Sequence, residues 1–141
     1  MIVYFEVIGA PRGKGRPKFA RRGKHTHVYS DDKTVAYETL IANEAKIAMA
    51  GLSPLSEPLE LGLTVYVEPV ASCSRKARES MLSGATWPAK KPDLDNVVKA
   101  VLDACNGITF VDDALVVRIR AEKKYAAIGR VAVTLQGVDE F

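Results

Sequence analysis

The chain of 141 residues is poor in the residues that build disulfide or zinc frameworks, since it has two cysteines and two histidines. Cys73 and Cys105 lie far apart, with no CxxC or Cys/His spacing around them, which argues against both kinds of framework. We therefore expect reduced, partly buried thiols in a cytoplasmic protein.

Long apolar runs are also missing. No stretch approaches the roughly eighteen apolar residues of a membrane helix, and the opening MIVYFEVIGA has no basic residues ahead of its apolar run, unlike a signal peptide. Neither a P-loop nor a Ser/His/Asp or Cys/His nucleophile arrangement is evident. These absences predict no membrane association and no nucleotide cofactor.

What remains is an ordinary globular composition, with 48% hydrophobic and 26% charged residues. Periodicity predicts strands at 2–8, 59–67, 115–125 and 129–136, and helices at 34–50, 74–82 and 94–105. The order β-α-β-α-α-β-β predicts an α/β (α+β) fold, in which helices pack on a mixed sheet. The length, without any long linker, predicts a single domain over residues 1–141.

Positive charge is concentrated near the N-terminus. The segment PRGKGRPKFARRGK, residues 11–24, holds seven basic residues and no acid, so with a net charge of +3 the rest of the chain sums to −4 (3 − 7). Glycines and prolines exclude a continuous helix here and predict an extended or turning loop. Such a loop suits a polyanion such as DNA, although a solvated charged loop would look the same. The basic residues expected to contact DNA are Arg12, Lys14, Arg16, Lys18, Arg21, Arg22 and Lys24, joined by Arg75, Lys76 and Arg78 of the second helix.

The stretch KPDLDNVVKAVLDACNGITFVDD, residues 91–113, carries aspartate pairs at both ends of one amphipathic helix. Asp93 stands at the N-cap, and Asn106-Gly107 supplies the stop. The helix should rise about 18 Å, and an extended return of residues 106–112 could cover roughly 23 Å. The chain then has enough reach to bring Asp112 and Asp113 back beside Asp93 and Asp95.

Each of these residues also has a purely structural interpretation. Asp93 could only cap the helix, Asp95 could only complement its dipole, and Asp112-Asp113 could be a turn. Lys99 could pair with Asp95 or with Asp103. Clustered carboxylates repel, however, by about 4 kcal/mol per pair ~4 Å apart at an effective dielectric near 20. The cluster therefore needs a cation, and carboxylate oxygens favour Mg²⁺ or Mn²⁺.

The same residues carry a family resemblance. KPDLDNVVKAVLDACNG followed by FVDDALVV resembles the signature of the RusA-type Holliday junction resolvases, which are endodeoxyribonucleases of bacteria and their phages. GKGRPKF and HVYSDDKTVAYE resemble the N-terminal part of phage-type members. The resemblance implies a cytoplasmic, phage- or prophage-encoded homodimer. Such a dimer would nick two opposed strands of a four-way DNA junction with Mg²⁺, in DNA recombination and repair.

The resemblance also assigns roles within the motif. It implies essential acids at Asp93, Asp95 and Asp113, an essential lysine at Lys99 and an accessory acid at Asp112. One position departs from the pattern, because Leu115 stands where many members have glutamine.

Two other functions fit the sequence less well. One is a non-catalytic nucleic-acid-binding module, and the other is a broader metal-dependent nuclease that cuts flaps or forks. The roles of His25, His27, Phe19 and Tyr29 in the basic segment stay open, between contacts with DNA and packing of the segment on the core.

Overall fold

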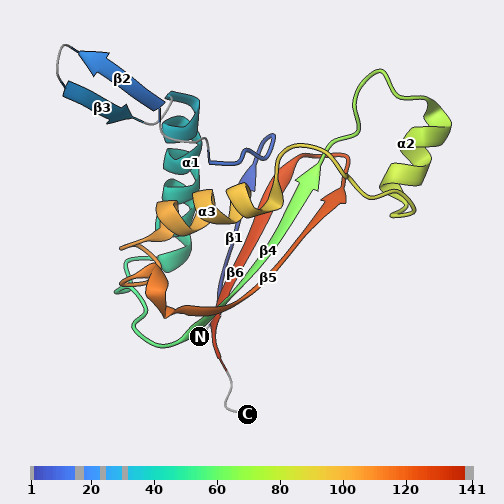
Figure 1. Ribbon diagram of the computed structural model, residues 1–141. Helices are drawn as coiled ribbons and strands as arrows, with labels where there is room; N and C mark the ends of the chain where they lie inside the picture. Colours follow the sequence, from blue (N-terminus) through green and yellow to red (C-terminus); the bar gives the residue numbers. More distant parts are fainter. Residues whose placement is uncertain (1, 15–17, 23–24, 30–31, 139–141) are drawn as a thin grey trace.

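A computed structural model describes residues 2–14, 18–22, 25–29 and 32–138. Of residues 18–22 and 25–29 it describes the backbone alone, and of the other described residues it also describes the side chains. In chain order the elements are β1 (Ile2–Ile8), β2 (Lys18–Arg22), β3 (His25–Tyr29), α1 (Asp32–Met49), β4 (Leu59–Val67), α2 (Arg75–Leu82), α3 (Leu94–Cys105), a short 3₁₀ turn η1 (Asp113–Leu115), β5 (Val116–Tyr125) and β6 (Arg130–Gly137) (Figure 1).

Within the described residues, four strands form a mixed sheet in the order β1-β6-β4-β5. Strand β5 runs parallel to β4, whereas β6 is antiparallel to both β1 and β4. Helices α1 and α3 pack on one face of this sheet (Figure 1). The predicted α+β fold with a mixed sheet is confirmed.

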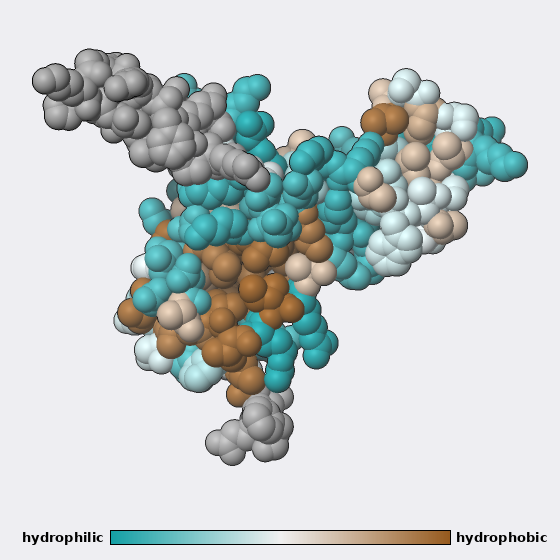
Figure 2. Space-filling model, in the orientation of Figure 1, coloured by the Kyte–Doolittle hydropathy of each residue, from teal (hydrophilic) through white to brown (hydrophobic). Residues whose placement is uncertain are grey.

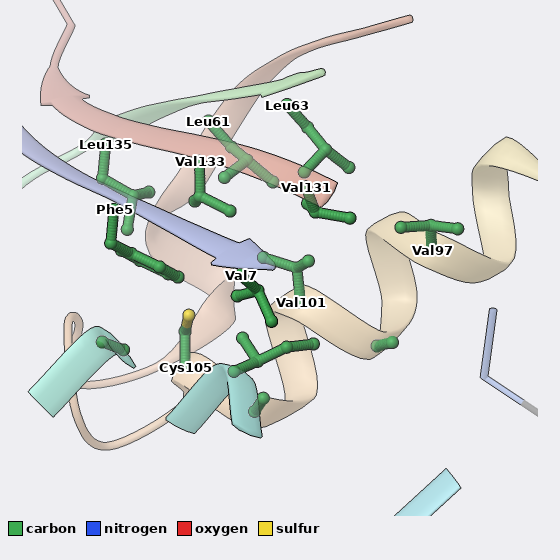
Figure 3. Packing of buried hydrophobic residues seen from close by; sticks show 14 of the residues in the cluster. Phe5, Val7, Leu61, Leu63, Val97, Val101, Cys105, Val131, Val133 and Leu135 are labelled. Carbon is green, nitrogen blue, oxygen red and sulfur yellow. The ribbon is translucent and has the colours of Figure 1, made fainter. Parts of the chain in front are cut away.

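The core lies between this face and the two helices. Alternate side chains of β4 and β6 are buried, as period-two strands require. Val97, Val101 and Cys105 of α3 are buried in one cluster with the sheet residues Val7 and Val133 (Figure 3). Burial raises the pKa of the Cys105 thiol to about 11, so this cysteine is a neutral core residue. The predicted apolar stripe of α3 is confirmed.

A separate hairpin of β2 and β3 occupies most of the basic segment. The two strands pair antiparallel from Lys18–Tyr29 to Arg22–His25, and Figure 1 shows them beyond the N-terminal end of α1. The predicted loop therefore contains strands. An apolar/polar alternation could not indicate them, because β2 reads Lys-Phe-Ala-Arg-Arg, in which the two apolar residues are adjacent.

The connection from α3 to β5 is compact and not extended. Gly107, with φ of 80°, turns the chain at once, and the Thr109 amide donates to the carbonyl of Cys105. Phe110 is fully buried, and Leu55 pairs with the chain on both sides of it, through Thr109 and Val111. The chain is thus held at the C-terminal end of α3 until β5 begins.

Strand β5 then runs back along α3. Its far end reaches the start of the helix, where Lys123 Nζ donates to the carbonyl oxygen of Pro92 at 3.1 Å. Within the described residues, no helix is long and apolar enough to cross a membrane.

Candidate active site

The first aspartate pair lies at the N-terminal end of α3. Asp93 has the extended backbone of an N-cap residue, but its side chain makes no capping hydrogen bond. Its carboxylate instead accepts a hydrogen bond of 2.8 Å from Lys91 Nζ, which lowers the pKa of Asp93. Asp95 is exposed in the first helical turn and forms no ion pair with the residues that the structure describes. Both carboxylates are therefore available at the surface.

A groove of about 440 Å³ brings the start of the basic segment to this corner. It is lined by Pro11, Arg12, Gly13, Lys14, Lys91, Pro92, Asp93 and Asn96. The two walls touch closely, since the Lys14 amide donates to the carbonyl of Asn96 at 2.9 Å. A Cβ at Gly13 would lie 2.7 Å from Cβ of Asn96, so only glycine fits here. Cationic and acidic groups thus share one concave surface.

Lys14 fixes this segment to the helices. Its ammonium group lies 2.8 Å from the carboxylate of Glu38 and 2.7 Å from that of Asp103. Hydrogen bonds to Asp103 and Glu38 raise the pKa of Lys14. For Lys99 the sequence allowed an ion pair with Asp95 or with Asp103. The structure shows the second, with Lys99 Nζ 3.0 Å from the carboxylate of Asp103. The structure therefore places Lys14 in an ion-pair network, and its contact with DNA stays a prediction.

Asp103 is the shared acid of this network. Burial of its side chain opposes the charged form, but hydrogen bonds from Lys14 and Lys99 outweigh that effect and lower the pKa of Asp103. The resulting stability is present above the ordinary aspartate pKa of about 4 and is lost as the pH falls through the lower folded value. The contribution of Lys14 is present below about pH 10.4 and is lost as the pH rises through its raised folded value.

We expect Lys14→Met to lower the free energy of unfolding by about 1.5–3 kcal/mol, the usual contribution of hydrogen bonds to charged groups. The loss should be full between about pH 5 and 9 and should shrink outside that window. Urea unfolding at several pH values measures it. The matched control is Lys124→Met, whose half-exposed pair with Glu122 should contribute less than about 1 kcal/mol. Equal losses of unfolding free energy in the two variants would contradict the stabilising role of the Lys14 network.

The second aspartate pair lies at the other end of α3. Asp112 accepts a hydrogen bond of 3.2 Å from the Ala114 amide and so caps η1, in which Asp113 is the first residue. Because α3 has 12 residues and β5 runs back along it, Asp113 lies about 20 Å from Asp93. Among the described residues, no group of three acids, histidines or cysteines is close enough to hold a metal ion.

The prediction that the return brings both aspartate pairs together within one chain is therefore wrong. The available length was sufficient, but the turn at Gly107 and the burial of Phe110 hold the chain at the far end of the helix. The assignment of Asp93, Asp95, Lys99, Asp112 and Asp113 to the site stays a prediction. Of these four aspartates, a single chain brings Asp93 and Asp95 together at one end of α3 and leaves Asp112 and Asp113 at the other.

Apart from Arg12 and Lys14, which line the groove, the residues expected to contact DNA divide into two groups. Arg75, Lys76 and Arg78 lie exposed on α2, which Ser74 caps as predicted, with a hydrogen bond of 3.1 Å from the Ala77 amide. The remaining group has its side chains outside the described residues: Arg16, Lys18, Arg21, Arg22 and Lys24, with Phe19, His25, His27 and Tyr29.

Two lysines were missed by the sequence analysis at the acidic corner, the N-terminal end of α3 that carries Asp93 and Asp95. Lys91 binds Asp93, and Lys123 holds the chain that leads to it through the carbonyl of Pro92. A signal for Lys123 exists, because it lies between Ala121 and Tyr125 on the partly buried register of β5, where an apolar residue is expected. A lysine at such a position indicates a specific partner.

Comparison with known proteins agrees with the sequence motif. The family model for endodeoxyribonuclease RusA matches residues 9–136, which include both aspartate pairs. The chain is also 30% identical over 141 residues to the uncharacterized protein YqaN of Bacillus subtilis (strain 168), with 96% of each chain covered. The resemblance found in the sequence is thereby confirmed. The chain belongs to the RusA endodeoxyribonuclease family.

Proposed function

We propose that this RusA-family nuclease is a Mg²⁺-dependent enzyme that resolves four-way DNA junctions by paired, symmetric nicks, in DNA recombination and repair. The observation that carries the proposal is the groove in which Arg12 and Lys91 lie beside Asp93. The cations of the groove could bind a DNA phosphate, and the carboxylate could bind a divalent metal ion. This combination is the one that metal-assisted phosphodiester hydrolysis requires.

The chemistry of the donors fits Mg²⁺, or Mn²⁺ in its place. Asp93 and Asp95 present carboxylate oxygens at one corner, and Mg²⁺ in nucleic-acid enzymes is held by one or two carboxylates together with substrate phosphate. A divalent ion bound there would lower the pKa of water and offset negative charge on the phosphate. Asp113 is expected to supply a third carboxylate, which this chain does not bring to the same corner.

We infer that a second copy of the chain supplies that third carboxylate. A two-fold axis across the middle of α3 would lay the two helices antiparallel. Each start of α3 would then face the end of the other, so that Asp93 and Asp95 of one subunit meet Asp113 of the partner subunit. Such a homodimer has two equivalent sites, which suits two opposed strands of a four-way junction.

The surface around Asp113 supports this arrangement. Strand β5 is an edge of the sheet, and unpaired edges favour association. Figure 2 shows an apolar area near α3 and the start of β5. The exposed large hydrophobic residues of this part of the chain are Val111, Val117 and Ile119. Apolar patches of this kind mark protein interfaces.

The remaining side chains would position the DNA. Lys99 lies one helical turn beyond Asp95 on the same face, so its ammonium group could stabilise charge that develops on the phosphate. Exposed cations of α2 and of the basic segment would hold the backbone of the arms. Binding should therefore weaken steeply with salt.

The test is incubation of a labelled mobile four-way junction with and without Mg²⁺, read on a sequencing gel. We expect paired nicks at symmetric positions that a ligase can seal, and none in EDTA. Binding without any metal-dependent cleavage would indicate a nucleic-acid-binding module instead. Asymmetric cuts on flaps and forks would indicate a broader nuclease.

A further inference from the structure

Trp87, the one tryptophan of the chain, lies exposed between α2 and α3, with 63% of its surface accessible. The chain on both sides of it is held in place. Before it, the Thr86 hydroxyl bonds that of Ser80 at 2.7 Å and the Thr86 amide donates to the Ser80 carbonyl. After it, Pro88 is buried and Lys123 binds the carbonyls of Lys90 and Pro92. The Trp87 indole is therefore not covered by the core, while the backbone on both sides of it is held by hydrogen bonds.

A hollow of about 390 Å³ lies beside the indole. Its lining consists of Leu82, Ser83, Gly84, Thr86, Trp87, Lys124 and Tyr125. Trp87 and Tyr125 give it two aromatic rings from different elements, and Lys90 Nζ lies 5.8 Å from the centre of the Tyr125 ring. Pockets of roughly 300–1,000 Å³ with aromatic walls and a few polar groups suit flat organic ligands.

The segment that carries Trp87 is positively charged. Residues 75–91 contain five basic residues and one acid, Glu79, which is paired with Arg75. The cations of this segment that form no ion pair with the described residues lie on both sides of Trp87, at Lys76 and Arg78 of α2 and at Lys90. Aromatic rings between cations are the arrangement with which proteins bind single-stranded nucleic acid, through base stacking and phosphate contacts.

We propose that Trp87 and Tyr125 form a pocket for one unpaired nucleobase of the strand that leads to Asp93. The inference rests on the proposed function, because the strand that enters the pocket is the one that the acidic corner would cut. Lys91 joins the two places, since it lies four residues after Trp87 and binds Asp93. A base held in this pocket would set the position of the nick.

Trp87 itself reports on the pocket, because no other tryptophan contributes to the fluorescence. The probes are a four-way junction with one unpaired thymine at the crossover, the same junction fully paired, and a linear duplex. All are titrated into the Asp95→Asn protein in EDTA. We expect the first to quench Trp87 emission most strongly. Trp87→Ala should weaken its affinity about tenfold while affinity for the duplex changes less than about twofold.

Trp87→Phe keeps a ring and should restore most of the affinity, and Ile47→Ala is the matched control. Ile47 is 71% exposed on α1 and should change nothing. Equal weakening on all three probes, or a change of subunit association in sedimentation after Trp87→Ala, would overturn the proposal. These experiments need no cleavage, so failure of the unsubstituted chain to cut the junction with Mg²⁺ would count against the nuclease alone.

Discussion

The Asp95→Asn protein is expected to lose at least about 1,000-fold of its Mg²⁺-dependent cleavage of a four-way junction, because a bound metal ion supplies several kcal/mol and each 1.4 kcal/mol is tenfold in rate. Asparagine has nearly the same shape but no negative charge. Since Asp95 is exposed and pairs with none of the described residues, the fold should be unchanged. Junction binding, which depends on cations, should be retained.

The measurement combines single-turnover cleavage with a binding titration in EDTA on the same labelled junction. Glu44→Gln is the matched control, because it removes one carboxylate of α1 that belongs to neither aspartate pair. Cleavage by Asp95→Asn at the parental rate would remove Asp95 from the site. Loss of binding together with cleavage would show that the residue supports the structure and not the chemistry.

The parts of the fold that local patterns determine could be predicted from the sequence. The stripe of α3 and the alternation of β4 each need one apolar face, and the structure buries those faces. Asn106-Gly107 ends α3 as expected. These features depend on residues within about two turns or one strand of each other, where periodicity is informative.

The candidate site depended on contacts that periodicity does not contain. Residues 106–112 are long enough to return to Asp93, but their length does not indicate in which direction the chain runs after α3. The direction comes from Phe110, which is buried, and from Leu55, whose backbone pairs with Thr109 and Val111. The sequence shows apolar residues at Leu55 and Phe110 without showing that the two segments meet.

Lys14 gives a second example of the same limit. In the sequence it is one of seven similar cations in a segment without acids. Its ion pairs follow from the packing of the segment on α1 and α3, because Gly13 allows the backbone to approach Asn96 and so places Lys14 between Glu38 and Asp103. Charge patterning can predict that such a segment meets a polyanion, but not which of its members bind within the protein.

The separation of the two aspartate pairs leads to the second large effect, which concerns mixtures of inactive subunits. Asp95→Asn and Asp113→Asn should each be inactive as homodimers. In a heterodimer of the two, the Asp113→Asn subunit keeps an intact Asp93–Asp95 pair, and its partner keeps an intact Asp113. If sites form between subunits, one of the two sites is therefore fully intact.

Co-expression with two different tags and sequential affinity purification gives the heterodimer free of both homodimers. We expect it to nick the junction at about half the wild-type rate, because one of two equivalent sites is intact. The product should be a singly nicked junction and not a resolved one, since the second site lacks both carboxylates. A gel that separates nicked from resolved junctions measures both quantities.

A heterodimer of Asp93→Asn with Asp95→Asn is the control, because it damages both sites wherever Asp113 comes from. It should be inactive. Activity in the first heterodimer and none in the control can arise only if the two aspartate pairs of one site belong to different chains. If both heterodimers are inactive while the unsubstituted dimer cuts, each site is made by one chain, and α3 and the segment after it must rearrange on DNA to bring Asp113 across the length of the helix.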